Sequence, residues 1–132
     1  LADNSPLRRF LFDGPVNNAV TADLSRGSTL GFSLYRGESN RPDLAEGWAI
    51  GPREVEMAAC GLFFPRDPRP EADELFPFLP TFADPIEFRE IVDHYLTRDD
   101  DRHRLAERAR EAVDGRTFRN HAAALLLRLE AL

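Results

Sequence analysis

The sequence predicts an α/β fold, a partial parallel sheet with flanking helices that ends in a helical tail. Short apolar runs alternate with helical patterns up to Phe82, and every pattern beyond Asp84 is helical. Strands that follow helices in this order run parallel and are covered on both faces. The length predicts one domain over residues 1–132, with residues 84–132 as its helical tail. The strands are too few for a full doubly wound domain, so we expect the chain to be part of a larger α/β protein. The remainder of the protein would precede Leu1.

The predicted strands are short apolar runs bounded by turn residues. Residues 29–35 form the clearest run, residues 62–64 follow a helix directly, and residues 79–82 predict one more short strand. Six of the ten prolines fall between Pro65 and Pro85. Proline lacks the backbone N–H that regular elements need, so residues 65–71 are expected to form an extended loop.

The predicted helices have recognisable starts and ends. Proline at the first helical position after Gly51, and the Asp84-Pro85-Ile86-Glu87 capping pattern, are typical of helix N-termini. Gly61 predicts the end of the helix that starts after Gly51. The five expected helices cover residues 15–24, 52–61, 84–96, 101–113 and 117–132, and the fourth is expected to face inward with Leu105, Ala106, Ala109, Ala112 and Val113.

The charge composition narrows the possible ligands. All 17 basic side chains are arginine, which excludes Schiff-base chemistry, a lysine base and a P-loop lysine. The net charge of -6 disfavours a nucleic acid or an anionic membrane as partner. Cys60 is the only cysteine and is expected to be a buried packing residue, and no apolar run is long enough to span a bilayer. These observations predict a cytoplasmic domain without a membrane span.

One cluster has the residue types of metal ligands. Asp93 and His94 are followed by the acidic run 99–101 and by His103. Their spacing fits no zinc pattern, and acidic residues at a helix N-terminus are favoured by the helix dipole. We therefore expect no metal and no bound cofactor, only a substrate.

The segment around Gly51 carries the candidate site. In an open parallel sheet, ligands lie beyond the carboxyl ends of the strands, where helices begin. The free N–H groups at Gly51 would suit a diphosphate, and Arg53 in the first turn would add a bidentate contact. Glu56, one turn further on, would accept hydrogen bonds from a ribose diol. The alternative is that Arg53 and Glu56 lie on a solvated helix face.

The same residues support a family resemblance. Gly51, Arg53, Glu56 and the run Ala59-Cys60-Gly61 resemble the G-x-x-x-x-E-A-x-A-x-G segment of GT-B fold glycosyltransferases. The similarity is greatest to the R-x-F-E-x-x-A-C-G form of the group 1, spore-maturation-protein-like branch, and the downstream order of segments agrees over roughly residues 15–132. The resemblance implies the Rossmann-like C-terminal half of a GT-B enzyme, with its N-terminal domain missing from the chain.

The resemblance also implies roles for individual residues. In the family, the glutamate aligned with Glu56 holds the ribose of a nucleotide-sugar, and the glycine aligned with Gly51 lets the phosphates approach. Many retaining members carry an acidic residue eight positions before that glutamate, where this chain has Trp48. The further possible donor contacts are Trp48, Pro52, Tyr35 and Arg36, and the candidates for a phosphate clamp, or alternatively for simple surface charges, are Arg36, Arg66 and Arg69.

Two functions remain open from the sequence. The resemblance implies a donor-binding domain that transfers a sugar from a nucleotide-sugar to an acceptor of undefined class. Catalysis would then come from positioning the donor and stabilising the departing diphosphate in a cleft against the N-terminal domain, so that this chain alone binds donor without turnover. The alternative is a catalytically silent α/β protein-interaction domain, which Trp48 at the acidic position favours.

Overall fold

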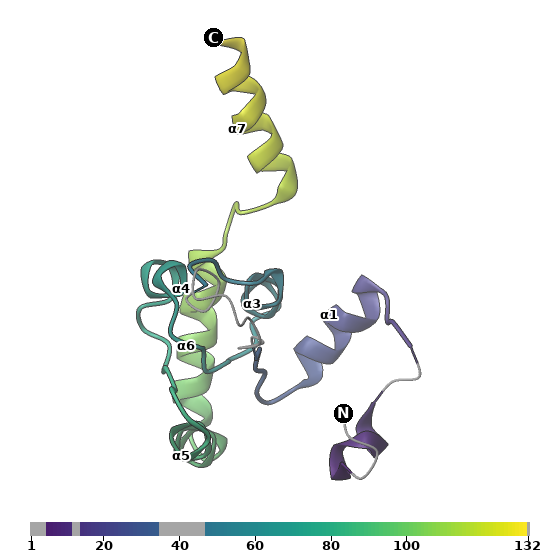
Figure 1. The fold of residues 1–132 in the computed structure, drawn as a ribbon, viewed down its shortest axis with the longest axis vertical. Coiled ribbons are helices and arrows are strands. Elements are labelled where there is room, and N and C mark those ends of the chain that lie inside the picture. Colours follow the sequence, from purple (N-terminus) through teal and green to yellow (C-terminus); the bar gives the residue numbers. More distant parts are fainter. Residues whose placement is uncertain (1–4, 12–13, 35–46, 132) are drawn as a thin grey trace.

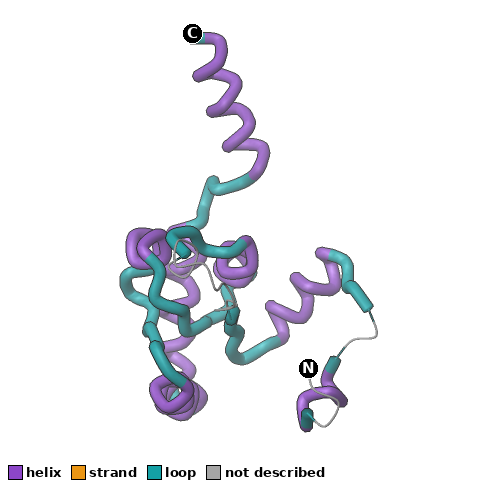
Figure 2. Tube along the Cα trace, in the orientation of Figure 1, coloured by secondary structure: helices purple, strands orange, loops and turns teal. Residues whose placement is uncertain are grey.

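The computed structural model of the chain describes residues 5–11, 14–34 and 47–131, which form helices joined by extended segments (Figures 1 and 2). The helices α1, α3, α5, α6 and α7 correspond to the five that the sequence predicts. The short helix α4 was not predicted; it begins at Pro70, so the extended loop expected over residues 65–71 ends before that residue. In chain order the elements are the 3-10 helix η1 (Pro6–Phe10), α1 (Asn18–Gly27), α3 (Pro52–Ala59), α4 (Pro70–Leu75), α5 (Pro85–Leu96), α6 (Asp99–Ala112) and α7 (Phe118–Glu130).

The predicted α/β fold is wrong for the described part of the chain, which contains no strand and therefore no Rossmann-like parallel sheet. Two of the predicted strands touch at one point, where the Gly31 N–H donates to the Phe63 carbonyl oxygen at 2.9 Å. The third meets the chain only in an isolated parallel bridge between Arg66 and Thr81. The next bonds of this parallel ladder would need the N–H groups of residues 68 and 80, and both residues are prolines, which have none.

The core forms where α3 packs against α6. Ala58 of α3 and Ala109 of α6 are fully buried, and Ala106 is nearly so. Small side chains at a helix contact let the two backbones approach closely. Met57 and Leu105 complete the contact, and both belong to the same buried cluster. As predicted, α6 turns Leu105, Ala106, Ala109, Ala112 and Val113 towards this core, of which Ala112 is half-buried.

A Schellman motif ends α3 and turns the chain into the core. The Leu62 N–H donates to the Met57 carbonyl at 3.0 Å and the Gly61 N–H to the Ala58 carbonyl at 2.9 Å. Gly61 has a φ of 71°, in the left-handed region that glycine adopts at little cost. Phe63 and Phe64 follow the turn directly, and Phe64 packs edge-to-face on Phe76 with the ring centroids 5.5 Å apart. Cys60, expected to be buried, is only half-buried at this turn.

Helix α5 is held by its N-cap and by aromatic contacts. The Asp84 carboxylate accepts the Ile86 and Glu87 N–H groups at 2.7 and 2.9 Å. The Phe88 ring packs on Phe82, and the Tyr95 ring packs on Phe63 at 4.6 Å between centroids. In Figure 1, α6 runs from α5 at the bottom of the body to α3 and α4 at its top.

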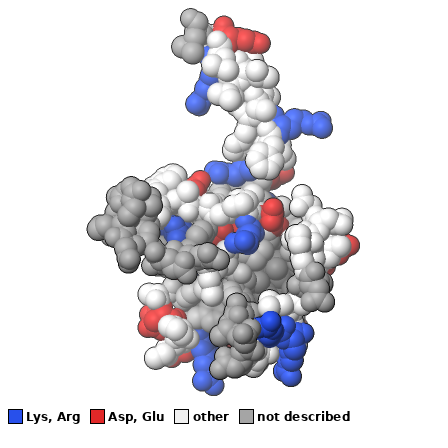
Figure 3. Space-filling view, turned by 45° about the vertical axis from the view of Figure 1, so that its right-hand side comes forward, with Lys and Arg blue, Asp and Glu red and all other residues white. Residues whose placement is uncertain are grey.

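Helix α7 projects away from this body. The turn after α6 contains Gly115, with a φ of 76°, and α7 then extends beyond α3 and α4 (Figure 1). Figure 3 shows its surface as largely uncharged. Its large apolar side chains are all exposed in the described range, namely Phe118, Leu125, Leu126, Leu127 and Leu129. None of the helices in residues 5–11, 14–34 and 47–131 has the length and apolar character that a membrane crossing demands.

The core assignment predicts unequal effects for two phenylalanine substitutions. Phe64→Ala removes a ring that is 0% exposed, and we expect it to lower the free energy of unfolding by about 3–5 kcal/mol. Phe118→Ala removes a ring that is 95% exposed and is expected to change this free energy by less than about 0.5 kcal/mol. Urea denaturation followed by circular dichroism measures both, and equal effects would contradict this core.

Candidate functional site

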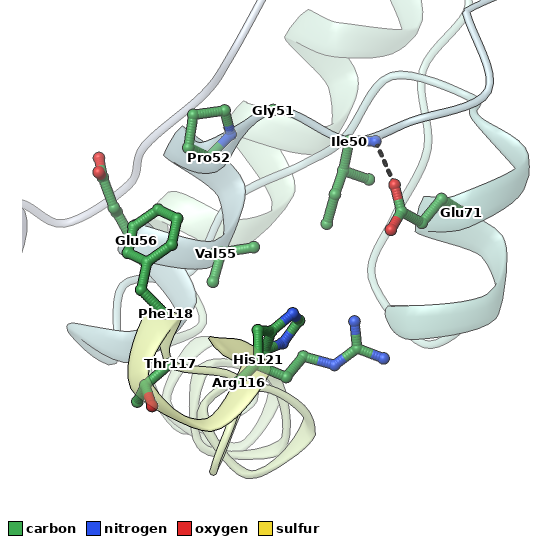
Figure 4. Close-up of a pocket in the computed structure, with 10 residues that line it drawn as sticks. All are labelled: Ile50, Gly51, Pro52, Val55, Glu56, Glu71, Arg116, Thr117, Phe118 and His121. Carbon is green, nitrogen blue, oxygen red and sulfur yellow. Dashed lines mark hydrogen bonds between the residues drawn. The ribbon is translucent and has the colours of Figure 1, made fainter. Parts of the chain in front are cut away.

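One cavity of about 270 Å³ lies between the start of α3 and the start of α7 (Figure 4). The start of α3 forms one wall, and the segment leading into α7 forms the facing wall. Glu71 of α4 closes one side. The residues that line the cavity are Ile50, Gly51, Pro52, Val55, Glu56, Glu71, Arg116, Thr117, Phe118 and His121.

The start of α3 directs the positive end of its helix dipole towards this cavity. Gly51 is the N-cap and Pro52 occupies the first helical position. The Glu54 carboxylate accepts the Gly51 N–H at 3.1 Å, while the Glu54 N–H bonds the Gly51 carbonyl, because glycine has no side chain to complete a capping box. The Arg53 N–H has no carbonyl four residues back within the helix. The helix start is thus rigid and partially positive.

Sequence reasoning missed Glu71, which ties the segment before α3 to α4. Its carboxylate accepts the Ile50 N–H at 2.8 Å (Figure 4), and its own N–H donates to the Trp48 carbonyl at 3.1 Å. Two bonds to neighbouring residues fix both the position and the direction of the backbone that enters Gly51. No local sequence signal marks this role, because the contact spans more than 20 residues.

Glu54 was also missed, although the sequence carries a signal for it. Its side chain caps the helix from inside the protein, with the residue only 3% exposed. A glutamate three residues after the N-cap is the second half of the capping-box pattern, and it predicts such a contact even when the cap is glycine. Glu54 therefore supports the helix start and does not face a ligand.

Glu56 lies at the edge of two hollows. It lines the cavity and also a groove of about 240 Å³ between α1 and α3, together with Asn18, Thr21 and Ser25. The residue is exposed. Figure 4 draws the Phe118 ring over the Glu56 side of the cavity. The carboxylate is accessible to a ligand that enters from either hollow.

Arg116 and His121 contribute the basic side chains of the facing wall. In Figure 4 both lie on the side of Glu71, across from the start of α3. His121 is exposed. Arg116 was not singled out, because its place in the wall depends on where α6 ends relative to α3.

The predicted site residues are only partly brought together. Gly51, Pro52 and Glu56 line the cavity, whereas Arg53 lies exposed on α3 outside its wall. Trp48 is 55% exposed and also lies outside the wall, with its carbonyl bound by Glu71. Tyr35 and Arg36 fall outside the described residues.

Neither Arg66 nor Arg69 is a surface charge, and neither lines the cavity. Arg66 is 4% exposed; its Nε donates to the Phe76 carbonyl at 3.1 Å and its Nη2 pairs with Asp73 at 2.6 Å. The Arg69 side chain packs so closely on Gly47 that a Cβ there would lie 1.8 Å from its Nη1. Both arginines hold the proline-rich segment together. Among the described residues, no three His, Cys, Asp or Glu side chains gather as metal ligands.

The chain matches the family model of glycosyl transferase-like proteins over residues 4–128. The match includes the helix α3 start, Glu56, Glu71 and the Arg116–His121 segment. Neither a curated protein nor a solved structure matches the chain significantly.

The contacts of Glu71 predict its effect on stability. Glu71→Ala removes the acceptor of the half-buried Ile50 N–H, and we expect a loss of about 1–2 kcal/mol in the free energy of unfolding. Glu71→Gln keeps a carbonyl acceptor and is expected to lose less. Urea denaturation measures both, with the exposed Glu74→Ala of the same helix as the control. Equal losses for Glu71→Ala and Glu74→Ala would contradict a stabilising hydrogen bond between the Ile50 N–H and the Glu71 carboxylate.

Proposed function

Because the chain belongs to the glycosyl transferase-like family, we propose that it is the part of a glycosyltransferase that binds a nucleotide-sugar donor. The proposal rests on one observation, a single cavity lined by the start of α3 at Gly51 and by Glu56 one turn further along the helix. A helix start suits phosphate oxygens, and a carboxylate suits the hydroxyls of a ribose. Together they match the two parts that every nucleotide-sugar contains.

We propose a donor orientation that follows from these groups. The diphosphate lies at Gly51, where the missing side chain lets phosphate oxygens approach the partially positive start of α3. The ribose lies at Glu56, whose carboxylate accepts hydrogen bonds from the 2′- and 3′-hydroxyls. Pro52 and Val55 supply apolar surface between them. This arrangement assigns no role to Arg53, which lies outside the cavity wall.

The proposed transfer reaction requires no covalent bond between this chain and the sugar. The bond between the anomeric carbon of the sugar and the diphosphate oxygen breaks, the acceptor oxygen bonds to that carbon, and the acceptor proton leaves. The departing nucleoside diphosphate gains negative charge, which the positive end of the α3 dipole stabilises. We further propose, on the Arg53, Glu56 and Cys60-Gly61 pattern, that the enzyme belongs to the spore-maturation-protein-like branch.

Glu56→Gln tests the ribose contact. Calorimetric titration of the chain with UDP, GDP and ADP is expected to give binding of at least one of them. For that nucleotide, loss of the charged acceptor is expected to weaken binding about tenfold, while its 2′,3′-dideoxy form binds the wild type and Glu56→Gln equally. Removing the Glu56 charge and removing the ribose hydroxyls should therefore weaken binding no more together than the loss of the hydroxyls does alone.

The exposed Glu74→Gln serves as the matched control, since Glu74 lies outside the cavity wall. It is expected to leave nucleotide affinity unchanged. A catalytically silent domain that binds only protein partners would bind none of the three nucleotides, and that result would reject the proposed function. Equal affinity of the wild type for the ribose and dideoxyribose forms would reject the role of Glu56.

A further inference from the structure

We infer that Arg116 and His121 bind the diphosphate of the donor from the wall that faces the start of α3. The inference rests on the proposed function, because it names further contacts within the same cavity. Both side chains line that cavity and belong to a segment 65 to 70 residues after Gly51 in sequence.

The cavity wall carries both acidic and basic side chains, and Arg116 is the basic one that can hold an anion at this end. The wall contains two carboxylates, Glu56 and Glu71, and two basic side chains, Arg116 and His121. The Glu71 carboxylate is bound to the Ile50 N–H. Most arginines near an acidic residue are paired within their helix, as Arg104 is with Asp101 at 2.7 Å. Within the described residues, no carboxylate pairs with the Arg116 guanidinium, which leaves its hydrogen-bond donors for a ligand.

Backbone bonds hold Arg116 in place without using its side chain. The Arg116 N–H donates to the Val113 carbonyl at 3.0 Å, and the Thr117 N–H donates to the Gly115 carbonyl at 2.9 Å. The Asn120 side chain adds a bond to the same Gly115 carbonyl at 2.7 Å. The turn between α6 and α7 is thus closed on itself, and it presents Arg116 at a defined point of the cavity wall.

The first turn of α7 places His121 beside it. The Thr117 hydroxyl accepts the Asn120 N–H at 3.2 Å, and the His121 N–H donates to the Thr117 carbonyl at 3.0 Å. In Figure 4 the His121 ring and the Arg116 side chain lie on one side of the cavity, across from Gly51 and Pro52. A diphosphate between the two walls would meet the positive end of the α3 dipole on one side and these side chains on the other.

Charge balance explains why the second wall is needed. A nucleoside diphosphate carries at least two negative charges, whereas a helix start supplies only about half a unit of positive charge. The chain has no lysine, and Arg53 lies outside the wall, so Arg116 is the permanent cation that this cavity offers. Its planar guanidinium binds two phosphate oxygens at once. His121 adds one ring N–H donor.

Arg116→Gln tests the inference by calorimetric titration of the chain. We expect binding of the best nucleoside diphosphate among UDP, GDP and ADP to weaken about tenfold or more, as for the loss of a charge-assisted contact. Binding of the corresponding nucleoside monophosphate should weaken less, so the preference for the diphosphate shrinks. His121→Gln should give a smaller loss in the same direction. Inorganic pyrophosphate, titrated alone, should also lose affinity in Arg116→Gln.

Arg119→Gln is the matched control, because Arg119 belongs to the first turn of α7 but lies outside the cavity wall. It should bind like the wild type, and an unchanged thermal transition of Arg116→Gln excludes unfolding as the cause. A wild type that binds nucleoside diphosphates through Glu56, with Arg116→Gln unchanged, overturns the inference and leaves the proposed function standing. Binding of pyrophosphate through Arg116 without binding of any nucleotide supports the contact and overturns the proposed function. If neither probe binds the wild type, both fail.

Discussion

The candidate site depends on the close contact between α3 and α6. Buried alanines on both helices, Ala58 and Ala109 above all, let the two backbones approach, and any larger side chain there would push them apart. Helix α3 begins at Gly51, and α6 leads into Arg116, so each helix carries one wall of the cavity. The distance between the walls is therefore set in the core and not by contacts within the cavity itself.

Arginines maintain this arrangement in ways that lysine would not. Arg66 binds the Phe76 carbonyl through Nε and Asp73 through Nη2, which joins the chain before α4 to the residues that follow it. Arg102 likewise donates to the Tyr95 carbonyl and to Asp99, which fastens the end of α5 to the start of α6. Each guanidinium reaches two acceptors in different directions from a nearly buried position. The lysine-free composition thus serves the fold at these two positions.

Local signals in the sequence predicted the helices, whereas strand pairing and the make-up of the cavity wall depend on contacts between distant segments. The caps at Gly51, Asp84 and Thr117 each lie within a few residues of the groups they satisfy, so their helices were predicted correctly. The sheet was wrong because apolar runs indicate burial but not pairing, and Pro68 and Pro80 stop the ladder after one bridge. Gly51 and Glu56 were found because they share one helix. Glu71 and Arg116 were not, since their positions depend on packing between distant segments.

Arg116 and His121, the two basic side chains of the cavity wall, are fixed in position to different degrees. This difference determines how much each can contribute to binding an anion. Arg116 precedes α7 and is fixed to the end of α6 by the Val113 carbonyl, so its position follows from the same packing that places Gly51. His121 belongs to α7, which projects from the body with its leucines exposed, so its position also depends on the direction of that helix. A preorganised cation loses less conformational entropy when it binds an anion. In the proposed diphosphate complex, we therefore expect Arg116 to contribute the larger share of the affinity and His121 to contribute according to how firmly α7 is held.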